Sequence, residues 1–225
     1  MCGRFAQVTD SKKLTELFSL ISNAAGSPRY NIAPTQPIVV IRHTLSGRTA
    51  QHMRWGLVPP WAPDLHNGAK LINARAETVF QKASFSVAAR HQRCIIPADA
   101  FYEWQKTENQ RIPTLFRPTT NVPFFFAGLW SPWASNEGDL VYTATILTTA
   151  ANDTMQPFHH RMPVILGRAD ADIWLEHTVT TPDRLLPLLK QAPNDAIRSQ
   201  PISTRVNSVR NDDLACWSAP ESPRG

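Results

Sequence analysis

The sequence contains no uncharged apolar run that approaches the roughly 20 residues of a membrane-spanning helix. Its longest candidates are Pro123–Trp133 and Leu140–Thr149. The N-terminus reads Met1-Cys2-Gly3-Arg4-Phe5 and lacks the basic and then apolar regions of a secretory signal peptide. These two absences argue against a helical membrane anchor and against secretion. We therefore expect a cytoplasmic protein that has no membrane partner and keeps its thiols reduced.

Cysteine is scarce: the chain has Cys2, Cys94 and Cys216 and no Cys-x-x-Cys pair. A structural zinc site normally needs four ligands at recognisable spacing, and this chain offers none. The adjacent His159 and His160 are a poor substitute, because neighbouring side chains diverge and no carboxylate lies at ligand spacing. We expect no metal and no cofactor. Cys94 lies in an apolar run and is predicted to be a buried strand thiol, whereas Cys216 is predicted to have no role.

The composition is that of a folded domain. The chain has 225 residues, of which 42% are hydrophobic, including seven Trp and ten Phe. A chain of this length can bury roughly 70–75% of its unfolded surface. This excludes a disordered chain, a collagen-like chain and a small disulfide-bonded scaffold. Because no repeat or low-complexity linker divides the sequence, we predict one domain over residues 1–217 and a short flexible tail at 218–225.

The charge is mildly basic. Lys and Arg number 23 against 18 Asp and Glu, which gives a net charge of +5. This excess is weak evidence for a polyanionic partner. The arginines are scattered along the chain rather than gathered in a tail, so any anion-binding site must be assembled by folding.

Short segments rich in aromatic or β-branched residues recur along the chain and are typical of strands. They are Ile38–Arg42, Gln51–Trp55, Cys94–Pro97, Phe101–Gln105, Thr114–Arg117, Phe124–Leu129, Leu140–Leu147, Val164–Leu166 and Ile202–Val209, with a turn at Ser46-Gly47 between the first two. Helical patterns predict helices through Leu14–Ile21, Ala76–Ala89, Asp170–His177 and Pro182–Lys190. Many strands with few intervening helices favour a mainly antiparallel α+β domain.

Cys2 has a specific chemical rationale. Aminopeptidases remove an initiator Met before a small residue, so the mature chain is predicted to begin with cysteine. Its α-amine and thiol have ordinary pKa values of about 7.7–8 and about 8.5, so both are partly deprotonated near neutral pH. The amine can form an imine with an aldehyde, and the thiol can then close a five-membered thiazolidine, which an internal cysteine cannot do. The alternative is that Cys2 is an accident of the second codon, but Gly3 and Arg4 suit close approach to a phosphate.

The segment Leu71–Glu77 carries polar residues at alternating positions. In an extended chain, Asn73, Arg75 and Glu77 point to one side, which is natural for a binding or catalytic site. A helix cap formed by Asn73, with Glu77 in the first turn, explains the same residues equally well.

Two further segments offer groups for proton transfer. In Ala100–Trp104, Glu103 lies among aromatic residues and either faces solvent or is partly buried, in which case desolvation raises its pKa and suits it to proton transfer. In Phe158–Pro163, His159 is a candidate proton carrier and Arg161 a candidate phosphate ligand. The alternative for this second segment is a loop packed by its apolar residues.

Aromatic and rigid residues lie beside arginines in Arg29–Pro34 and Arg54–Trp61. Basic grooves with stacking platforms hold single-stranded nucleic acid, and apolar wedges separate base steps. We assign Trp55 to the core but not Trp61, which has prolines on both sides.

Five of these segments together resemble the SRAP family, the abasic-site processing proteins. They are Met1–Phe5, Tyr30–Pro34, Asn73–Arg75, Phe101–Trp104 and His159–Pro163, and the resemblance runs from Cys2 to about Arg210. Each motif is weak alone, but five in order are highly specific. The resemblance implies a single α+β domain with a barrel-like core and peripheral helices. It also implies a DNA-damage (SOS) response protein that binds single-stranded DNA and crosslinks covalently to abasic sites through Cys2, shielding the lesion.

The resemblance also implies roles for individual residues. Cys2 is the nucleophile, and Asn73 orients Cys2 or the opened sugar. Glu103 and His159 move protons. DNA contacts are implied for Arg4, Asn31, Pro34, Trp61, Arg75, Trp104, Thr148 and Arg161, with phosphates at the arginines and Thr148.

Pro34 and Trp61 are expected to act as a wedge where single-stranded DNA meets a duplex. Some members carry a second aromatic after the matching Trp, where this chain has Ala62. The family is linked to lyase-like character and to autoproteolytic removal of residues before Cys2, and here only Met1 precedes it. We expect a monomer in the cytoplasm, associated with the nucleoid when bound to DNA.

Two other classes of function stay open. Cys2 also suits a cysteine-type N-terminal nucleophile hydrolase or peptidase, in which the terminal amine serves as base. Such hydrolases need an Asn-Gly-Asp-like oxyanion element, and the one Asn-Gly pair here, Asn67-Gly68, precedes Ala69. The other class is a non-covalent single-strand binding module in which Cys2 is inert; an SDS-resistant adduct with abasic DNA distinguishes it from the covalent mechanism.

Overall fold

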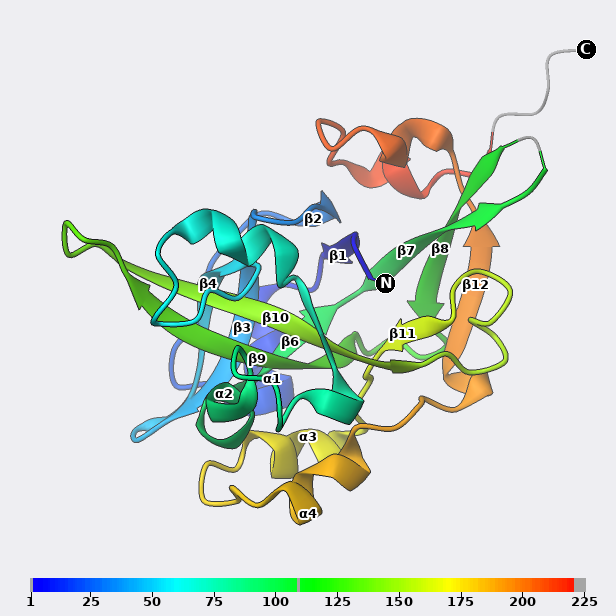
Figure 1. Cartoon of the computed structure of the whole chain (residues 1–225). Helices are drawn as coiled ribbons and strands as arrows, with labels where there is room; N and C mark the ends of the chain where they lie inside the picture. The colour runs from blue at the N-terminus through cyan, green and yellow to red at the C-terminus, as the bar shows by residue number, and fades with distance from the viewer. Residues whose placement is uncertain (1, 109, 221–225) are drawn as a thin grey trace, which may run out of the picture.

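Strands dominate the structure, a computed structural model that describes residues 2–108 and 110–220 (Figure 1). The strands are β1 Phe5–Gln7, β2 Arg29–Ile32, β3 Pro37–Thr44, β4 Gly47–Trp55, β5 Asn73–Arg75, β6 Arg93–Ala98, β7 Ala100–Lys106, β8 Arg111–Pro118, β9 Phe124–Ala134, β10 Leu140–Ala150, β11 Arg161–Pro163 and β12 Ile197–Pro201. The α-helices are α1 Ser11–Phe18, α2 Ser86–His91, α3 Arg168–Leu175 and α4 Pro182–Leu185. Short 3-10 turns occur at Leu65–Lys70, Ala76–Thr78, Leu186–Leu188, Asn194–Ala196, Thr204–Asn207 and Leu214–Trp217.

The strands form two sheets. The seven-stranded sheet has the order β11-β10-β4-β3-β6-β9, with β5 paired to β10. Because β10 also pairs with β9, this sheet closes on itself like a barrel. The five-stranded sheet has the order β12-β8-β7-β1-β2, and all of its neighbours are antiparallel.

The β3–β4 hairpin shows why the sequence forms these strands. The register runs from Pro37 opposite Arg54 to Thr44 opposite Gly47. Gly47 has φ 133°, a region that side chains disfavour, so glycine suits the turn. The turn predicted at Ser46-Gly47 is therefore confirmed.

A hydrophobic cluster fills the space between the two sheets. Phe5 of β1 meets Trp55 of β4 edge to face, with ring centroids 4.9 Å apart. Cys94 of β6 has no exposed surface, as predicted for a strand thiol, and Trp55 is equally buried. The cluster includes Cys2, Phe5, Ile32, Ile38, Val40, Met53, Trp55, Cys94, Ile96, Phe101, Phe116, Phe124, Phe126, Ile146, Met155 and Met162. The N-terminal residues are thus part of the core.

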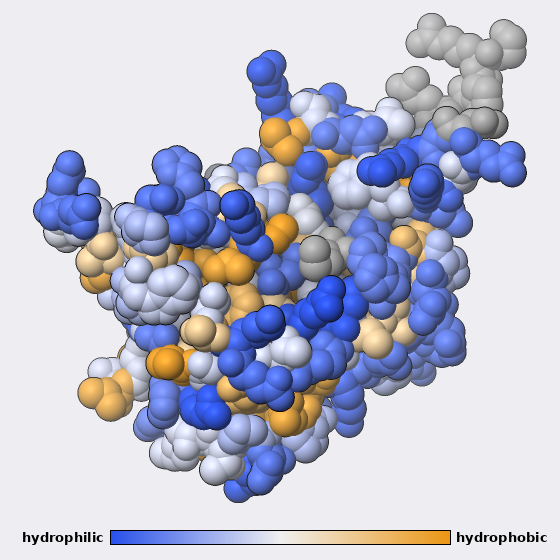
Figure 2. Space-filling model, in the orientation of Figure 1, coloured by the Kyte–Doolittle hydropathy of each residue, from blue (hydrophilic) through white to orange (hydrophobic). Residues whose placement is uncertain are grey.

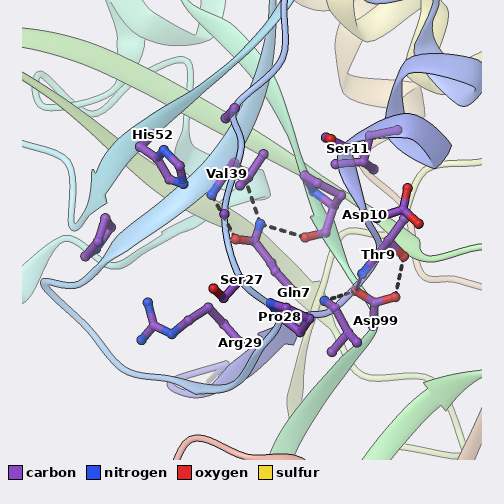
Figure 3. A pocket seen from close by; sticks show the side chains of 16 residues that line it. Gln7, Thr9, Asp10, Ser11, Ser27, Pro28, Arg29, Val39, His52 and Asp99 are labelled. Atoms are coloured by element: carbon purple, nitrogen blue, oxygen red, sulfur yellow. Dashed lines mark hydrogen bonds between the residues drawn. The ribbon is translucent and has the colours of Figure 1, made fainter.

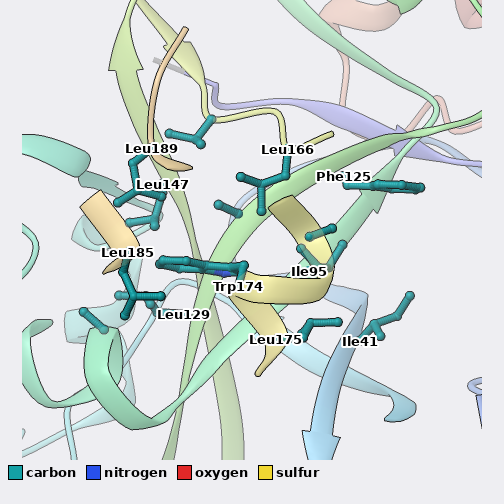
Figure 4. Close-up of a cluster of buried hydrophobic side chains, with 14 of the residues drawn as sticks. Ile41, Ile95, Phe125, Leu129, Leu147, Leu166, Trp174, Leu175, Leu185 and Leu189 are labelled. Carbon is teal, nitrogen blue, oxygen red and sulfur yellow. The ribbon is translucent and has the colours of Figure 1, made fainter. Parts of the chain in front are cut away.

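A second cluster joins the helices to the outside of the closed sheet (Figure 4). Trp174 of α3 is fully buried, and its indole N–H donates to the carbonyls of Cys94 (3.0 Å) and Gly128 (3.3 Å). Figure 1 shows helices α1 to α4 gathered on one side of the molecule, whereas the segment after β12 lies on the opposite side, beside β7 and β8. This arrangement leaves the start of β1 between the two.

The helix predicted at Ala76–Ala89 is wrong. The chain forms a 3-10 turn at Ala76–Thr78, further turns, and then the short helix α2. Val79 and Ala89 are nonetheless both buried in the cluster around Trp174. The β-branched residues and serines of this segment weaken a continuous helix. The turns bury Val79 and Phe80 but leave Val87 exposed.

The strand predicted at Ile202–Val209 is also wrong. The last strand is β12, which ends at Pro201, and a 3-10 turn follows. The Ser203 hydroxyl accepts a hydrogen bond from the Arg205 N–H (3.2 Å) and begins this turn. Ile202 and Val206 are buried, but Thr204 between them is exposed. In a strand all three residues would share one face, so this pattern suits a turn.

Smaller differences concern the ends of elements. Helix α1 ends at Phe18, because Ser19 adopts a left-handed conformation. Pro187 limits the helix predicted at Pro182–Lys190 to α4 and a 3-10 turn. Strand β11 precedes the predicted Val164–Leu166, of which Ile165 forms an isolated bridge. Cys216 was predicted to have no role, but it is fully buried and contributes to packing.

The predicted fold class is confirmed: the domain is α+β, mainly antiparallel, with a barrel-like closed sheet and peripheral helices. Within the described ranges, no helix has the length and apolar composition to cross a membrane. On the face shown in Figure 2, hydrophilic side chains surround small separate hydrophobic areas. Met1 and residues 221–225 of the tail predicted at 218–225 lie outside the described residues.

Candidate functional site

Cys2 lies just before β1, against strand β7. The Tyr102 N–H donates to the Arg4 carbonyl (3.0 Å), and Phe5 pairs with Phe101, so the first residues run beside this strand. Cys2 has no exposed surface and packs in the cluster between the sheets. Burial raises the pKa of the Cys2 thiol, and the nearby Glu103 carboxylate raises it further. The thiol is therefore protonated at neutral pH and needs a base before it can react.

Asn73 holds the backbone of Cys2. The side-chain amide donates to the Cys2 carbonyl at 2.8 Å. Asn73 begins β5, which pairs in parallel with β10 through Ile146, so the extended interpretation is confirmed for Asn73–Arg75. Glu77 lies in the following 3-10 turn, as the alternative predicted for that residue. A helix cap by Asn73 is excluded, because the following 3-10 turn begins after Arg75 and has no side-chain cap. The Asn73 Oδ1 atom is buried and has no hydrogen-bond partner among the described residues, so it can accept from a ligand.

Glu103 lies in the middle of β7, opposite Thr114 of β8. It is only 9% exposed, which rules out the solvent-facing alternative. Burial raises the pKa of the Glu103 carboxyl above its usual range. Its carboxylate lies close enough to the Cys2 thiol to raise the pKa of that thiol. We call Cys2, Asn73 and Glu103 the Cys2 site.

His159 ends the turn that leads into β11. Its Nδ1 atom contacts the Arg161 N–H at 2.9 Å and the Arg161 carbonyl at 3.2 Å, which fixes the orientation of the ring. Burial lowers the pKa of His159, so the neutral imidazole predominates at neutral pH. Met155 and Met162, on either side of His159 in the chain, pack in the same cluster as Cys2. The fold thus brings the His159 segment to the core that also holds the Cys2 site.

Arg161 is engaged in an ion pair. Its guanidinium contacts both carboxylate oxygens of Glu77, at 2.6 and 2.9 Å. It also donates to the Thr148 carbonyl at 2.5 Å. Thr148 of β10 pairs with Arg75 of β5 on one side and Pro163 of β11 on the other, so three strands assemble this group. We call Arg75, Glu77, Thr148 and Arg161 the Arg161 group.

Arg4, Asn31 and Trp104 form a second polar group. The Arg4 guanidinium donates to Asn31 Oδ1 (2.7 Å) and to the Val206 carbonyl (2.8 Å), and it lies 5.6 Å from the centre of the Trp104 ring. Trp104 in turn donates to the Asn207 side chain at 2.7 Å. We call Arg4, Asn31 and Trp104 the Arg4 group; the segment after β12 holds it in place.

Asn31 is fully buried. Its amide nitrogen contacts the carbonyls of Val206 (3.1 Å), Ser208 (2.9 Å) and Asn211 (2.6 Å). In this conformation Asn31 positions Arg4 and the C-terminal segment, with no surface of its own for a ligand.

The two residues expected to form a wedge lie on loops at the end of β4. The loop with Pro34 is tied to this strand, because the Thr35 N–H donates to the Trp55 carbonyl at 2.8 Å. The loop with Trp61 follows β4 directly. Trp61 is 67% exposed, which confirms its assignment outside the core. Ala62 is buried, and its carbonyl accepts from Trp133, so the loop below Trp61 is anchored.

Two elements of this region were missed by reasoning from the sequence. One is the ion pair between Glu77 and Arg161. The sequence showed that Glu77 alternates with Arg75, but it did not show that Glu77 contacts Arg161. The other is the segment Val206–Asn211, which carries no recognisable motif. Both depend on residues far apart in the sequence.

A cavity of about 360 Å³ opens elsewhere, beside β1, β3 and α1 (Figure 3). None of the predicted site residues lines it. Gln7 in its wall bonds to the Val39 backbone in both directions, and Asp99 accepts from the backbone of Val8 and Thr9. These polar groups hold neighbouring strands together.

The sequence matches a described protein family and is similar to named proteins. A family model described as SOS response associated peptidase (SRAP) matches residues 1–209. The chain is 40% identical over 216 residues to the abasic site processing protein YoqW of Bacillus subtilis (strain 168), covering 94% of this chain and 96% of that protein. It is 31% identical over 221 residues to the abasic site processing protein HMCES of Gallus gallus, covering 84% of this chain and 65% of that protein.

Solved structures share the fold. A crystal structure of a protein from Bordetella bronchiseptica superposes with a TM-score of 0.79 at 29% identity, covering 90% of this chain and all of that one. A protein from Bacteroides thetaiotaomicron superposes with a TM-score of 0.87, covering 97% and 99% of the two chains. At 22% identity, this second likeness concerns the fold alone.

Proposed function

The chain belongs to the SRAP family, and from this premise we propose that it captures abasic sites in single-stranded DNA by a covalent bond through Cys2. The names of its relatives support abasic sites as the target. The contact of Asn73 with the Cys2 backbone, beside a buried Glu103, is the observation that carries the proposal. It is an arrangement that orients a reactive residue and supplies a proton acceptor.

The proposed reaction begins after removal of Met1. The freed Cys2 amine adds to the C1′ aldehyde of the opened abasic sugar, and loss of one water gives an imine. The Cys2 sulfur then bonds to the same carbon, its proton passes to the imine nitrogen, and a thiazolidine results. The net change is the loss of one water per adduct.

Residues around Cys2 have separate tasks in this scheme. Asn73 fixes the Cys2 backbone, and its free Oδ1 can accept a hydrogen bond from the sugar. His159, neutral at neutral pH, assists opening of the sugar ring. Glu103 assists loss of water and carries the thiol proton, which is necessary because the thiol is protonated in its buried position.

Trapping by sulfur has a protective result. An imine alone favours β-elimination and strand cleavage, which gives the protein weak lyase character. Ring closure removes the imine and keeps the strand intact. We propose that the adduct shields the lesion during the DNA-damage response, and that removal of Met1, by aminopeptidase or autocatalytically, precedes it.

DNA binding is assigned to the two polar groups and the loops at the end of β4. Arg4, Arg75 and Arg161 meet phosphates, together with Thr148. Trp104 lines the path beside Arg4, and Asn31 acts by positioning Arg4. Pro34 and Trp61 wedge at the junction of single- and double-stranded DNA, to which the exposure of Trp61 is suited. The protein acts as a monomer in the cytoplasm, on DNA of the nucleoid.

The test is a denaturing gel with a single-stranded oligonucleotide that carries one abasic site. Wild type should give an SDS-resistant adduct, and Cys2→Ala should give none while it keeps salt-sensitive binding. Cys94→Ala is the matched control, because Cys94 is also a fully buried thiol with a raised pKa. An adduct in Cys2→Ala would refute the assignment of the nucleophile.

Mass spectrometry of the adduct tests the chemistry. The expected mass is that of the chain without Met1 plus the oligonucleotide minus one water. An adduct that retains Met1 would exclude the imine at the Cys2 amine. Release of glutamate from glutamine without any adduct would favour the hydrolase alternative.

A further inference from the structure

A group of metal-ligating side chains lies where strand β3 meets the end of helix α3. His43 is next to the last residue of β3, and Glu176 and His177 follow α3 directly. One ligand atom from each lies within 4.8 Å of the other two. The two imidazole rings meet edge to face, with centroids 4.9 Å apart. This group shares no residue with the proposed DNA site and does not depend on that function.

The donor atoms of this group are available. The Nδ1 atom of His43 is buried and has no hydrogen-bond partner among the described residues. The Glu176 Oε1 atom accepts hydrogen bonds from the Thr178 N–H and hydroxyl, at 3.2 and 3.0 Å, which orient the carboxylate. Arg93 donates to the Glu176 carbonyl at 2.5 Å and fixes its backbone. His177 is exposed, and its Nδ1 lies 3.4 Å from the Glu176 carboxylate.

We propose that His43, Glu176 and His177 bind a divalent transition-metal ion, with zinc as the expected occupant and water at the open position. Two imidazoles and one carboxylate form a donor set that zinc accepts. Around zinc, at metal–ligand distances of about 2.0–2.1 Å, neighbouring ligand atoms lie roughly 3.4 Å apart. The ligand atoms, within 4.8 Å of one another, reach this spacing by side-chain movement of about 1 Å, which the exposed His177 permits.

The ion would connect two segments that are remote in the sequence. It would join the β3–β4 hairpin to the end of α3, whose Trp174 is central to the cluster between the helices and the closed sheet. The proposed site is therefore stabilising rather than catalytic. Spacing along the chain gave no sign of it, because the ligands come together only in the fold.

The experiment measures zinc binding to the full chain, without a histidine tag, after treatment with a chelator and its removal. Titration calorimetry should show one zinc ion per chain, and zinc should raise the melting temperature. His177→Ala, an exposed position that the fold tolerates, should weaken binding at least tenfold and abolish the thermal shift. His66→Ala is the matched control, because His66 is also an exposed histidine, 3.5 Å from the Asp64 carboxylate.

Further variants keep the test decisive. Glu176→Gln should also weaken zinc binding, and Co²⁺ bound to wild type should show the visible absorption of a low-coordinate site. The proposal is overturned if wild type binds no zinc, or if His177→Ala and Glu176→Gln bind it as wild type does. Binding that is lost only in Cys2→Ala would place the ion at the Cys2 site and would equally overturn it.

Discussion

Replacing Glu77 by Gln should strengthen the binding of single-stranded DNA. In the free protein, the Arg161 guanidinium is occupied by both carboxylate oxygens of Glu77. A phosphate that binds Arg161 must compete with this carboxylate and is repelled by it. Hydrogen bonding from Arg161 lowers the pKa of Glu77, so Glu77 is charged at neutral pH. Glutamine keeps the shape of the side chain and removes the charge.

The magnitude follows from the geometry and the exposure of the pair. Arg161 is 11% exposed and Glu77 is 50% exposed, so solvent screens the carboxylate strongly. Two like charges on opposite sides of a guanidinium, about 6 Å apart, repel by roughly 0.7 kcal/mol at the dielectric constant of water. Partly exposed ion pairs contribute about 0.2–1 kcal/mol. We therefore expect a gain of about 0.5–1 kcal/mol, or roughly two- to fivefold tighter binding.

The assay is fluorescence anisotropy with an oligonucleotide that has no abasic site, so that no covalent step contributes. The gain should shrink as salt is added, because screening weakens the repulsion that was removed. Glu137→Gln is the matched control, since it makes the same change of net charge on an exposed loop. The gain should also vanish when Arg161→Ala is added. Unchanged or weaker binding in Glu77→Gln would show that the ion pair is structural and that Arg161 does not meet a phosphate.

The remaining predictions concern single side chains. Glu103→Gln should slow adduct formation by about 10²–10⁴-fold in a timed gel assay. Because burial raises the pKa of Glu103, its contribution to stability is present at low pH and is lost as the pH rises through that pKa. Glu103→Gln should therefore gain stability relative to wild type as the pH rises. If urea unfolding shows the same change of stability with pH in both proteins, the burial argument is contradicted. Asn31→Ala should lower the free energy of unfolding by about 2–4 kcal/mol, since it removes several buried hydrogen bonds. It should also weaken DNA binding, because Asn31 positions Arg4. Unchanged DNA binding would show that Arg4 is not part of the DNA site. Trp61→Ala should leave the melting temperature almost unchanged, because Trp61 is largely exposed. The same change should weaken binding to junction DNA by about 1–3 kcal/mol. If wild type and Trp61→Ala both bind junction DNA and plain single strands with equal affinity, Trp61 is not part of the interface.

Some features could be predicted from the sequence because they depend on neighbouring residues. Two segments rich in apolar and β-branched residues, separated by the Ser46-Gly47 turn, predicted the β3–β4 hairpin. Flanking prolines separated the exposed Trp61 from the buried Trp55. The order of five short motifs identified the family, and Cys2 was recognisable as a 1,2-aminothiol from its position alone.

The errors also have a local cause. The segment Ala76–Ala89 has apolar residues at helical spacing, yet the structure breaks it into turns that bury Val79 and Phe80 and leave Val87 exposed. At Ile202–Val209, the capping hydroxyl of Ser203 favoured a turn over a strand. In both places several conformations satisfy the same local pattern, and packing against the rest of the chain selects among them.

By itself, the sequence determined the α+β class, most strands and the residue types available for chemistry, because periodicity, turn residues and motifs act over a few positions. Only the tertiary structure decided that β10 pairs with β9 and closes the sheet, that Asn73 reaches the Cys2 carbonyl, that Glu77 occupies Arg161 and that Asn31 is buried under Arg4. The pattern of apolar and polar residues in a strand constrains which face is buried but leaves open which distant strand lies beside it. These contacts therefore depend on strand register and on packing across the whole domain.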